Sequence, residues 1–290
     1  METGRNSRIL VVGGGSWATA LIKILSQNVN SISWWMRDES AIEHLKLHSH
    51  NPKYLQSTEF DMENITISSD LNTLIDGAEI IIIAVPSAFV HDTFKKITGE
   101  ALHGKFIFSA LKGMIPEMNV IPARYLHKNF GIPYSKIGII CGPCHAEEVA
   151  MERLSYLTVA CSEISVANEM AKQLECRYIK ASVSDDLFGT EFSAILKNVY
   201  ALATGISAGL GYGDNFQAVL ISNSIREIEK FIDALHPIHR DTKTSAYLGD
   251  LLVTAYSKFS RNRTFGFMIG KGYSVKAAQL EMNMVAEGYY

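Results

Sequence analysis

The order of apolar and polar residues divides the chain into two regions of different periodicity. In the first region, short runs rich in Ile and Val alternate with amphipathic stretches such as WATALIKILSQN and SVANEMAKQLE. These runs predict strands at 8–12, 31–36, 65–68, 79–85, 105–110, 136–140, 156–161 and 176–182. Nearly all-apolar strands that alternate with helices are typical of a parallel sheet covered by helices on both faces.

The pattern becomes purely helical after about Ser184. The segment DDLFGTEFSAILKNVYALATGISAGL and the residues after it contain no convincing strand, and GLGYGDN (209–215) separates two of the expected helices. We therefore expect an α/β N-terminal domain at 1–185 and an all-α C-terminal domain at 186–290. Because no polar linker separates them, the connection should be tight and packed.

Three small residues follow the first predicted strand and open the first helix. Gly13 would make a tight turn, Gly15 would let the backbone approach a pyrophosphate, and Ala18 would let the helix pack close to the sheet. The pyrophosphate would then lie on N–H groups at the positive end of the helix. A glycine-rich turn without a ligand is the alternative, but the strand–turn–helix context favours a dinucleotide site.

The end of the second predicted strand, WWMRDES, is where a coenzyme ribose would be recognised. An acidic residue there would bind the 2′-hydroxyl of NAD, whereas an arginine can pair with the 2′-phosphate of NADP. The chain has Arg37 first and Asp38 second, so the pattern leaves the choice between NAD and NADP open.

Composition narrows the class of protein without identifying it. The chain is 47% apolar and 20% charged with a formal charge of −3, which is typical of a globular protein and not of a general nucleic-acid binder. No stretch approaches 18 uninterrupted apolar residues, so no membrane span is predicted. Four cysteines and no apolar signal segment favour free thiols and a cytoplasmic location.

The stretch CGPCHAEE, which begins at Cys141, has several interpretations. A Cys-x-x-Cys pair can serve a thiol–disulfide oxidoreductase, and Cys-x-x-Cys-His is also an attachment pattern for haem. The third interpretation is that the cysteines are incidental and that the Gly-Pro turn at a strand end matters instead. Because Cys141 follows the apolar run KIGII, it is expected to be buried, which favours this third interpretation.

Several charged residues lie where ligands bind in open parallel sheets or inside apolar helices. Lys112 follows a predicted strand, and Lys197 lies within the apolar helix EFSAILKNVYALATG. A lysine there either extends to solvent or is buried with a lowered pKa that suits proton transfer. SKFSRNRTFG (257–266) is a candidate phosphate site, or else an exposed loop, and Asp250 is a candidate partner for a lysine.

Nine segments in order along the chain resemble the NAD(P)-dependent glycerol-3-phosphate dehydrogenases. They are GGGSWATAL, NPKYL, AVPS, LKG, CGPCHAEE, EFSAILKNVYALATG, GYGDN, GDLLVTAYSKFSRNRTFG and VAEG. The resemblance implies a Rossmann-like N-terminal domain, a helical substrate and catalytic domain, and NAD or NADP as the coenzyme. It also implies interconversion of dihydroxyacetone phosphate and sn-glycerol 3-phosphate, a supply of glycerol 3-phosphate for phospholipid synthesis, and a homodimer.

The resemblance also assigns roles to individual residues, and it implies no metal ligand. Lys197 would be the general acid and base, assisted by Lys112 and Asp250. Coenzyme contacts are implied for Gly13, Gly15, Ser16, Trp17, Arg37, Tyr54, Lys112, Ala146, Arg261, Val285 and Glu287. Substrate contacts are implied for Lys112, Gly142, Cys144, Lys197, Asp250, Ser260, Arg261 and Asn262.

The chain departs from the family pattern at a few places. The family usually has glycine at the position of Ala18 and a hydroxyl or amide residue at that of Cys144, so a substrate contact there is in doubt. FQAVLISNSI replaces a segment that commonly carries Thr and an Arg-Gly pair. The family also continues past Gly288 into further helix, so the C-terminal domain is expected to be short, which affects the last helices and the dimer contact.

Two alternative functions are also compatible with the sequence. A 3-hydroxyacid or 6-phosphogluconate-type dehydrogenase has the same two-domain plan, although the SRNR cluster argues against it. A non-catalytic NAD(P)-binding redox sensor, switched through Cys141 and Cys144, would bind coenzyme without turnover. Such a sensor would have no need to keep Lys112, Lys197 and Asp250 together.

Overall fold

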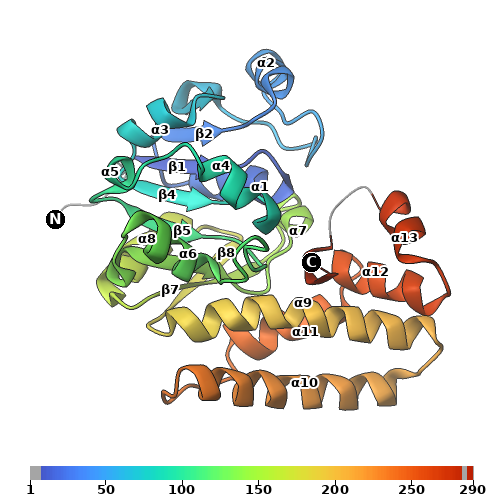
Figure 1. The fold of residues 1–290 in the computed structure, drawn as a ribbon. Helices are drawn as coiled ribbons and strands as arrows, with labels where there is room; N and C mark the ends of the chain where they lie inside the picture. Colours follow the sequence, from blue (N-terminus) through green and yellow to red (C-terminus); the bar gives the residue numbers. More distant parts are fainter. Residues whose placement is uncertain (1–7, 283–285, 290) are drawn as a thin grey trace.

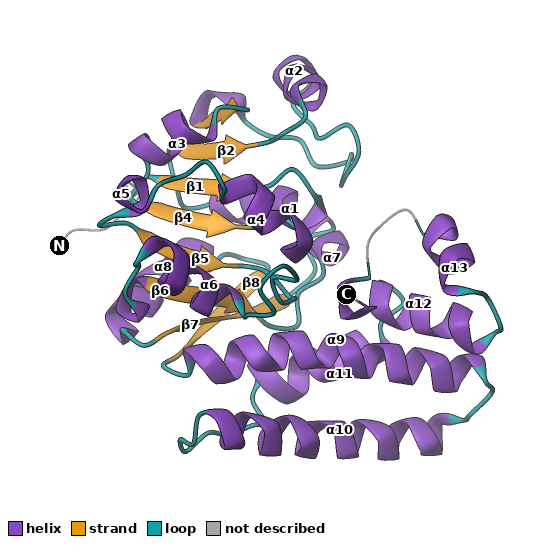
Figure 2. Cartoon of the chain, viewed as in Figure 1, coloured by secondary structure: helices purple, strands orange, loops and turns teal. Residues whose placement is uncertain are grey.

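A single sheet of eight strands forms the N-terminal region of the computed structural model, which describes residues 8–282 and 286–289 (Figures 1 and 2). The strands are β1 (Ile9–Val12), β2 (Ile32–Trp35), β3 (Ile65–Ser68), β4 (Ile80–Ile83), β5 (Phe106–Ser109), β6 (Ile137–Cys141), β7 (Ser155–Cys161) and β8 (Ile179–Ser184). The order β3-β2-β1-β4-β5-β6-β7-β8 reverses direction at β1, as in doubly wound nucleotide-binding folds. All eight predicted strands are present.

Strand direction differs from the expectation at one place. β7 runs antiparallel to β6, with Ile139 opposite Ala160, while all the other neighbouring pairs are parallel. The apolar character of β7 does not reveal this, because a strand buried on both faces has the same composition in either direction. β8 also begins at Ile179 instead of 176, and much of it is exposed.

Among the described residues, eight helices accompany the sheet and five follow it. The first group is α1 (Ser16–Leu25), α2 (Glu39–His48), α3 (Leu71–Gly77), α4 (Val90–Phe94), α5 (Gly99–Leu102), α6 (Pro122–Phe130), α7 (Ala146–Ala150) and α8 (Ile164–Leu174). The second group is α9 (Leu187–Gly209), α10 (Asp214–Leu235), α11 (Asp250–Tyr256), α12 (Arg261–Gly270) and α13 (Val275–Glu281). Among the described residues no strand follows β8, which confirms an α/β region followed by an all-α region.

The short helical turns are η1 (Met62–Asn64), η2 (Ser87–Phe89), η3 (Tyr134–Lys136) and η5 (Glu287–Tyr289), and a π-helical turn, η4 (Ser245–Gly249), leads directly into α11.

Two apolar cores lie on opposite faces of the sheet, and β1 contributes to both. Ile9 and Val11 pack with residues of α1, α2 and α8, whereas Leu10 and Val12 pack on the other side with α3, α4 and α6. The second of these cores continues into the C-terminal region through apolar residues of α9, α10 and α11. The two regions therefore share one packed interior, as the absence of a polar linker predicted, and the proposed boundary at residue 185 lies between β8 and α9.

Helices α9 and α12 approach each other closely because both carry glycines at the crossing. A Cβ atom on Gly205 would lie 2.1 Å from the carbonyl oxygen of Arg263, and one on Gly266 would lie 2.2 Å from that of Leu202. These distances leave no room for a side chain. The contact brings the first residues of α12 beside the middle of α9, where the catalytic candidates lie (Figure 2).

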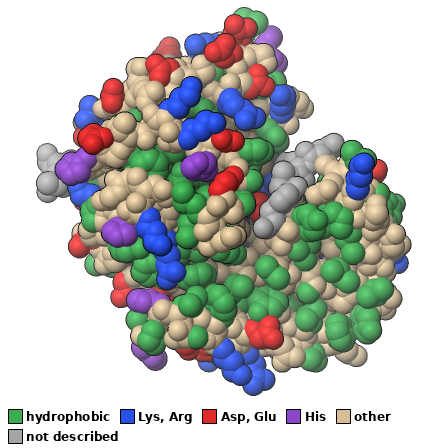
Figure 3. Space-filling model, in the orientation of Figure 1, with side chains coloured by type: hydrophobic (Ala, Val, Ile, Leu, Met, Phe, Trp, Pro, Cys, Tyr) green, Lys and Arg blue, Asp and Glu red, His purple; other side chains and the backbone are tan. Residues whose placement is uncertain are grey.

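Hydrophobic side chains gather on the surface of the helical region (Figure 3). On α10, the exposed side chains include Phe216, Val219, Phe231 and Leu235. Across residues 8–282 and 286–289, no helix is both long enough and apolar enough to cross a membrane.

Candidate active site

The glycine-rich turn joins β1 to α1 and opens the coenzyme side of the site. Gly13 adopts a φ of +142°, and a Cβ atom there would lie 2.7 Å from the carbonyl oxygen of Ala84, so only glycine fits. Gly15 occupies the N-cap position of α1, where no side chain caps the helix. No neighbouring atom lies within 4 Å of the position that a Cβ atom on Gly15 would take. Backbone N–H groups at this end of α1 can therefore approach an anion, as the motif predicted.

Asn51, which the sequence reasoning did not single out, holds this turn in place. Its side-chain amide donates to the carbonyl oxygen of Gly14 at 3.1 Å and to the Thr19 hydroxyl at 2.9 Å. Its own amide oxygen accepts from the backbone N–H of Tyr54 at 3.1 Å. The NPKYL segment thus connects the glycine-rich turn to Tyr54.

Arg37 and Asp38 lie at the outer edge of the coenzyme region. Asp38 caps α2 and accepts a hydrogen bond from the Lys53 ammonium at 2.8 Å, which holds the pKa of its carboxyl well below the usual range. That carboxylate is therefore already bound to protein groups. Arg37 is exposed, its guanidinium carbon lies 5.8 Å from the centre of the Phe89 ring, and it does not line the cavity.

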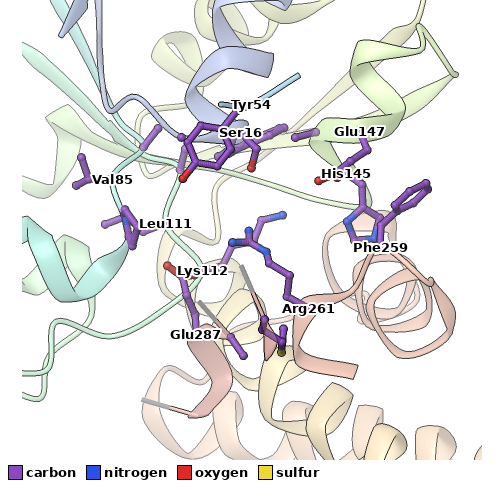
Figure 4. Close-up of a pocket in the computed structure, with 18 of the residues that line it drawn as sticks. Ser16, Tyr54, Val85, Leu111, Lys112, His145, Glu147, Phe259, Arg261 and Glu287 are labelled. Atoms are coloured by element: carbon purple, nitrogen blue, oxygen red, sulfur yellow. The ribbon is translucent and has the colours of Figure 1, made fainter. Parts of the chain in front are cut away.

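A cavity of about 360 Å³ extends from the carboxyl ends of the strands to the helical region (Figure 4). Arg261 and Glu287 face Ser16 and Tyr54 across this space. Its walls are formed by Gly15, Ser16, Trp17, Tyr54, Ala84, Val85, Pro86, Phe89, Ala110, Leu111, Lys112, Cys144, His145, Ala146, Glu147, Phe259, Arg261, Phe265, Gln279, Met282, Ala286, Glu287 and Tyr289. Most of the residues assigned to the coenzyme from the sequence are among them, and Val285 lies outside the described residues.

Lys197 and Asp250 form a buried ion pair at the base of the site. The Lys197 ammonium donates to Asp250 Oδ1, and Oδ2 of the same carboxylate accepts from the Gly142 backbone N–H at 3.3 Å. The two residues are only 2% and 1% exposed, so Lys197 does not extend to solvent. The sequence suggested Asp250 as a partner for a lysine but did not decide between a buried and an exposed Lys197, and the structure shows the two in contact.

The protonation of this pair follows from its surroundings. Burial lowers the pKa of Lys197 and Lys112 lowers it further, while Asp250 partly opposes them. Burial alone would raise the pKa of Asp250, but Lys197 and Lys112 outweigh it and hold that pKa below its usual value. The aspartate therefore stays ionised while the lysine can exchange its proton more readily than an exposed lysine.

Lys112 follows β5 and lies between the coenzyme and catalytic sides. Its ammonium lies 5.3 Å from the centre of the Trp17 ring, and its carbonyl oxygen accepts from the Asn198 side chain at 2.7 Å. Asn198 lies next to Lys197 on α9, so this bond ties the catalytic helix to the end of β5. The sequence reasoning did not identify Asn198.

A smaller cavity of about 60 Å³ adjoins the first one beside Lys197. It is lined by Lys112, His145, Lys197, Asn198, Thr254, Phe259, Ser260, Arg261, Asn262 and Glu287. Ser260 caps α12, accepting from the Arg263 N–H at 3.3 Å, so Arg261 and Asn262 are the first residues of that helix. A guanidinium at a helix N-terminus suits a phosphate group. Ser260, Arg261 and Asn262 of the SRNR cluster therefore line the site and are not a remote exposed loop.

Gly142 and the two cysteines lie at the end of β6. Gly142 has a φ of +120°, and a Cβ atom there would lie 2.8 Å from the carbonyl oxygen of Tyr156. Cys141 and Cys144 are buried free thiols, and burial raises the pKa of each to about 12. Neither is a thiolate near neutral pH, which counts against a redox role for the pair.

Glu287, near the C-terminal end, lines both cavities. Its carboxylate accepts from the Ser87 backbone N–H at 3.3 Å, and the neighbouring Gly288 N–H donates to Asn262 Oδ1 at 2.9 Å. These bonds connect the sheet region, η5 and the start of α12.

His145 and Phe259 were also missed, although both line the two cavities. His145 belongs to the CGPCHAEE stretch, in which the cysteine spacing is the more distinctive pattern. Within the described ranges, no group of three or more His, Cys, Asp or Glu side chains is arranged to hold a metal ion.

Two family models together match most of the chain. The model for the NAD-dependent glycerol-3-phosphate dehydrogenase N-terminus matches residues 8–167, and the model for the C-terminus of the same enzymes matches residues 186–290. Residues 168–185, between the two matches, belong to neither model.

Individual relatives agree with the family models. A glycerol-3-phosphate dehydrogenase [NAD(P)+] of Staphylococcus carnosus is 32% identical over 285 residues, covering 98% of this chain and 86% of the relative. The corresponding protein of Prosthecochloris aestuarii is 33% identical over 281 residues, covering 97% and 84%. The crystal structure of glycerol-3-phosphate dehydrogenase from Coxiella burnetii has a TM-score of 0.90 at 27% identity, covering 98% of this chain and 86% of that one.

Proposed function

The chain belongs to the family of NAD(P)-dependent glycerol-3-phosphate dehydrogenases, and from this premise we propose that Lys197 is the general acid and base of its reaction. The reaction interconverts dihydroxyacetone phosphate and sn-glycerol 3-phosphate. The observation that carries the proposal is the buried contact between Lys197 and Asp250 beside a cavity lined by Arg261 and Asn262.

The groups that line the larger cavity suit a dinucleotide. The start of α1, which has no side-chain cap, and Gly15 suit the pyrophosphate, and the cavity leads from there towards Lys112 and Lys197. When bound, the coenzyme supplies or accepts the hydride. We propose that Ser16, Trp17, Tyr54, Ala146 and Glu287 form its binding site, with Arg37 at the adenine end.

At the smaller cavity, protein groups would orient the ketone and complete its reduction. Arg261 and the N-terminus of α12 hold the phosphate, which places the C2 carbonyl near Lys197. Negative charge develops on the C2 oxygen as hydride adds to the carbon, and the Lys197 ammonium both stabilises that charge and gives up a proton. Oxidation of the alcohol runs the same path in reverse, with neutral Lys197 taking the hydroxyl proton.

Asp250 and Lys112 would tune this step. Asp250 fixes the position of Lys197 through one oxygen and is itself held by the Gly142 N–H through the other. Lys112 adds positive charge at the junction of the two cavities and favours an anionic substrate. Gly142 and Cys144 would shape the pocket wall.

The decisive assay measures the oxidation of NADH and of NADPH by absorbance with dihydroxyacetone phosphate as the substrate. Oxidation that depends on the ketone supports the proposal, and the ratio of rates for the two coenzymes reports what Arg37 recognises. Coenzyme binding without any turnover would refute it. A supply of glycerol 3-phosphate for phospholipids, in the cytoplasm, is the physiological role that we propose.

We further propose a homodimer, supported by the exposed Phe216, Val219, Phe231 and Leu235 on α10. Light scattering of the purified protein measures its mass directly, and a monomer at micromolar concentration would contradict this assignment.

A further inference from the structure

His145 lies at the junction of the two cavities but has no part in the mechanism above. It follows the end of β6 and occupies the position before α7, and it lines both the larger and the smaller cavity. Its ring centre lies 6.1 Å from that of Phe259, and Figure 4 shows the two side chains next to each other with Arg261 and Lys112 nearby.

The Nε2 atom of His145 is buried and has no hydrogen-bond partner among the described residues. Burying a polar atom without a partner is costly, and most buried polar groups in native proteins have one. The His145 side chain also makes no capping hydrogen bond to the backbone N–H groups of α7. An imidazole left unsatisfied at the wall of a substrate cavity is therefore suited to a bound ligand.

The groups around His145 favour the neutral imidazole. Burial, together with the positive charges of Lys112, Lys197 and Arg261, lowers its pKa to about 4 against the opposing effect of Asp250. A neutral imidazole has one donor and one acceptor nitrogen, whereas the nearby ammonium and guanidinium groups can only donate. His145 therefore offers an acceptor that these cations lack.

The other neutral side chains of the smaller cavity are already engaged with protein groups. Thr254 donates to the Asp250 carbonyl oxygen at 2.6 Å, and Asn262 Oδ1 accepts from Gly288. The Asn198 amide donates to Lys112, and Ser260 Oγ accepts from the Arg263 N–H. These hydrogen bonds restrict how the four side chains can bind a ligand, whereas His145 Nε2 makes no hydrogen bond to a described residue.

We propose that His145 binds the free C1 hydroxyl of the ketone phosphate and so selects substrates that carry it. This inference rests on the proposed function, in which the phosphate is bound by Arg261 and the C2 oxygen by Lys197. The remaining polar group of the substrate is a hydroxyl, which both donates and accepts. A neutral imidazole can accept a hydrogen bond from that hydroxyl or donate one to it, whereas a third cation could only donate.

The test compares dihydroxyacetone phosphate with acetol phosphate, which lacks only the C1 hydroxyl. We measure kcat and KM for both substrates with the parent enzyme, His145→Phe and His145→Gln. Phenylalanine keeps a ring against Phe259 but removes both nitrogens, and glutamine keeps a donor and an acceptor. Thermal unfolding of each variant checks that the fold is intact.

The parent should prefer dihydroxyacetone phosphate by about tenfold or more in kcat/KM, as the loss of one hydrogen bond implies. His145→Phe should lose most of that preference by losing activity on dihydroxyacetone phosphate, with activity on acetol phosphate changed by less than about threefold. His145→Gln should recover part of the preference.

Equal losses on both substrates, or an unchanged preference in His145→Phe, would overturn the assignment and point to a structural role or a phosphate contact. A parent enzyme that reduces neither ketone would instead refute the proposed function, and this inference with it.

Discussion

Lys197 and Asp250 form a buried pair in which the pKa of each side chain depends on the charge of the other. The lysine is easier to deprotonate because it is out of water, and the aspartate stays charged because two ammonium groups face it. In a low dielectric, losing one partner leaves the other as an unpaired charge. The pair is thus suited to moving a proton without losing the charge that positions it.

Replacing Lys197 with methionine should lower kcat at least about a hundredfold, because the proton donor is lost while the volume is kept. Coenzyme affinity should change by less than about threefold, since Lys197 does not line the larger cavity. Steady-state kinetics and coenzyme titration measure the two effects separately. A variant that retains more than about a hundredth of the parent activity would contradict the acid and base role.

The pH dependence of the parent enzyme also tests the role of Lys197, because reduction and oxidation need opposite protonation states of its amine. Ketone reduction needs protonated Lys197, so its kcat/KM should fall as pH rises through the Lys197 pKa, which burial places below its ordinary value of 10.5. Alcohol oxidation needs the neutral amine and should rise over the same range. Profiles in which both directions change alike would refute the assignment.

At the residue scale, the sequence identified Lys197 as a candidate but did not show whether its side chain is buried or exposed. The helical pattern showed that a lysine lay in an apolar helix, yet the choice between burial and exposure depended on Asp250, which is distant in sequence. Asn198 and His145 were missed for a related reason. Their importance comes from contacts with Lys112 and with the cavities, which no local pattern encodes.

At the scale of elements, one buried network fixes the start of α9 relative to the segment before Asp250. Asp186 caps α9, accepting from the Gly189 N–H at 2.9 Å, and its other oxygen accepts from Arg240 Nε at 2.8 Å and from the Tyr247 hydroxyl at 2.6 Å. Tyr247 belongs to η4, which leads into Asp250. The network therefore links the helices that carry the two catalytic partners.

Arg240→Ala should lower the free energy of unfolding by about 3 kcal/mol, because it leaves the Asp186 carboxylate buried without its cation. Lys95→Ala is the matched control, since Lys95 pairs with Asp92 on the exposed surface and its loss should cost less than about 1 kcal/mol. Chemical denaturation measures both. Equal effects would show that the buried network does not stabilise the fold.

The positions of the strands and helices could be predicted from the sequence, but the direction of every strand in the sheet could not. Short apolar runs bounded by polar residues located every strand of the sheet to within a few residues. The antiparallel direction of β7 was not predicted, because direction depends on how the connection from β6 returns and not on the strand itself.

At the scale of the whole molecule, the two halves of the site meet because α9 and α12 pack backbone against backbone. Gly205 and Gly266 remove the side chains that would otherwise hold these helices apart. Lys197 lies on α9 and Arg261 begins α12, so the spacing between the proton donor and the phosphate site depends on this contact.

Gly205→Ala should raise KM for dihydroxyacetone phosphate by about tenfold and lower stability by about 1–3 kcal/mol, because the added methyl group forces α9 and α12 apart. Gly77→Ala provides the control, as it also adds a methyl group within a helix but no atom lies within 4 Å of its site. The control should be neutral or slightly stabilising. Kinetic constants that do not change in Gly205→Ala would show that the helix spacing does not set substrate affinity.

The position of Trp17 gives the molecule an optical property. Trp34 and Trp35 are buried in the cores on opposite faces of the sheet, whereas the Trp17 indole lines the larger cavity next to Lys112. Its emission should therefore respond when a nicotinamide ring enters that cavity, and energy transfer to the reduced coenzyme would produce a sensitised signal. Binding can then be followed in unlabelled protein, with Trp17→Phe identifying the contribution of that one indole.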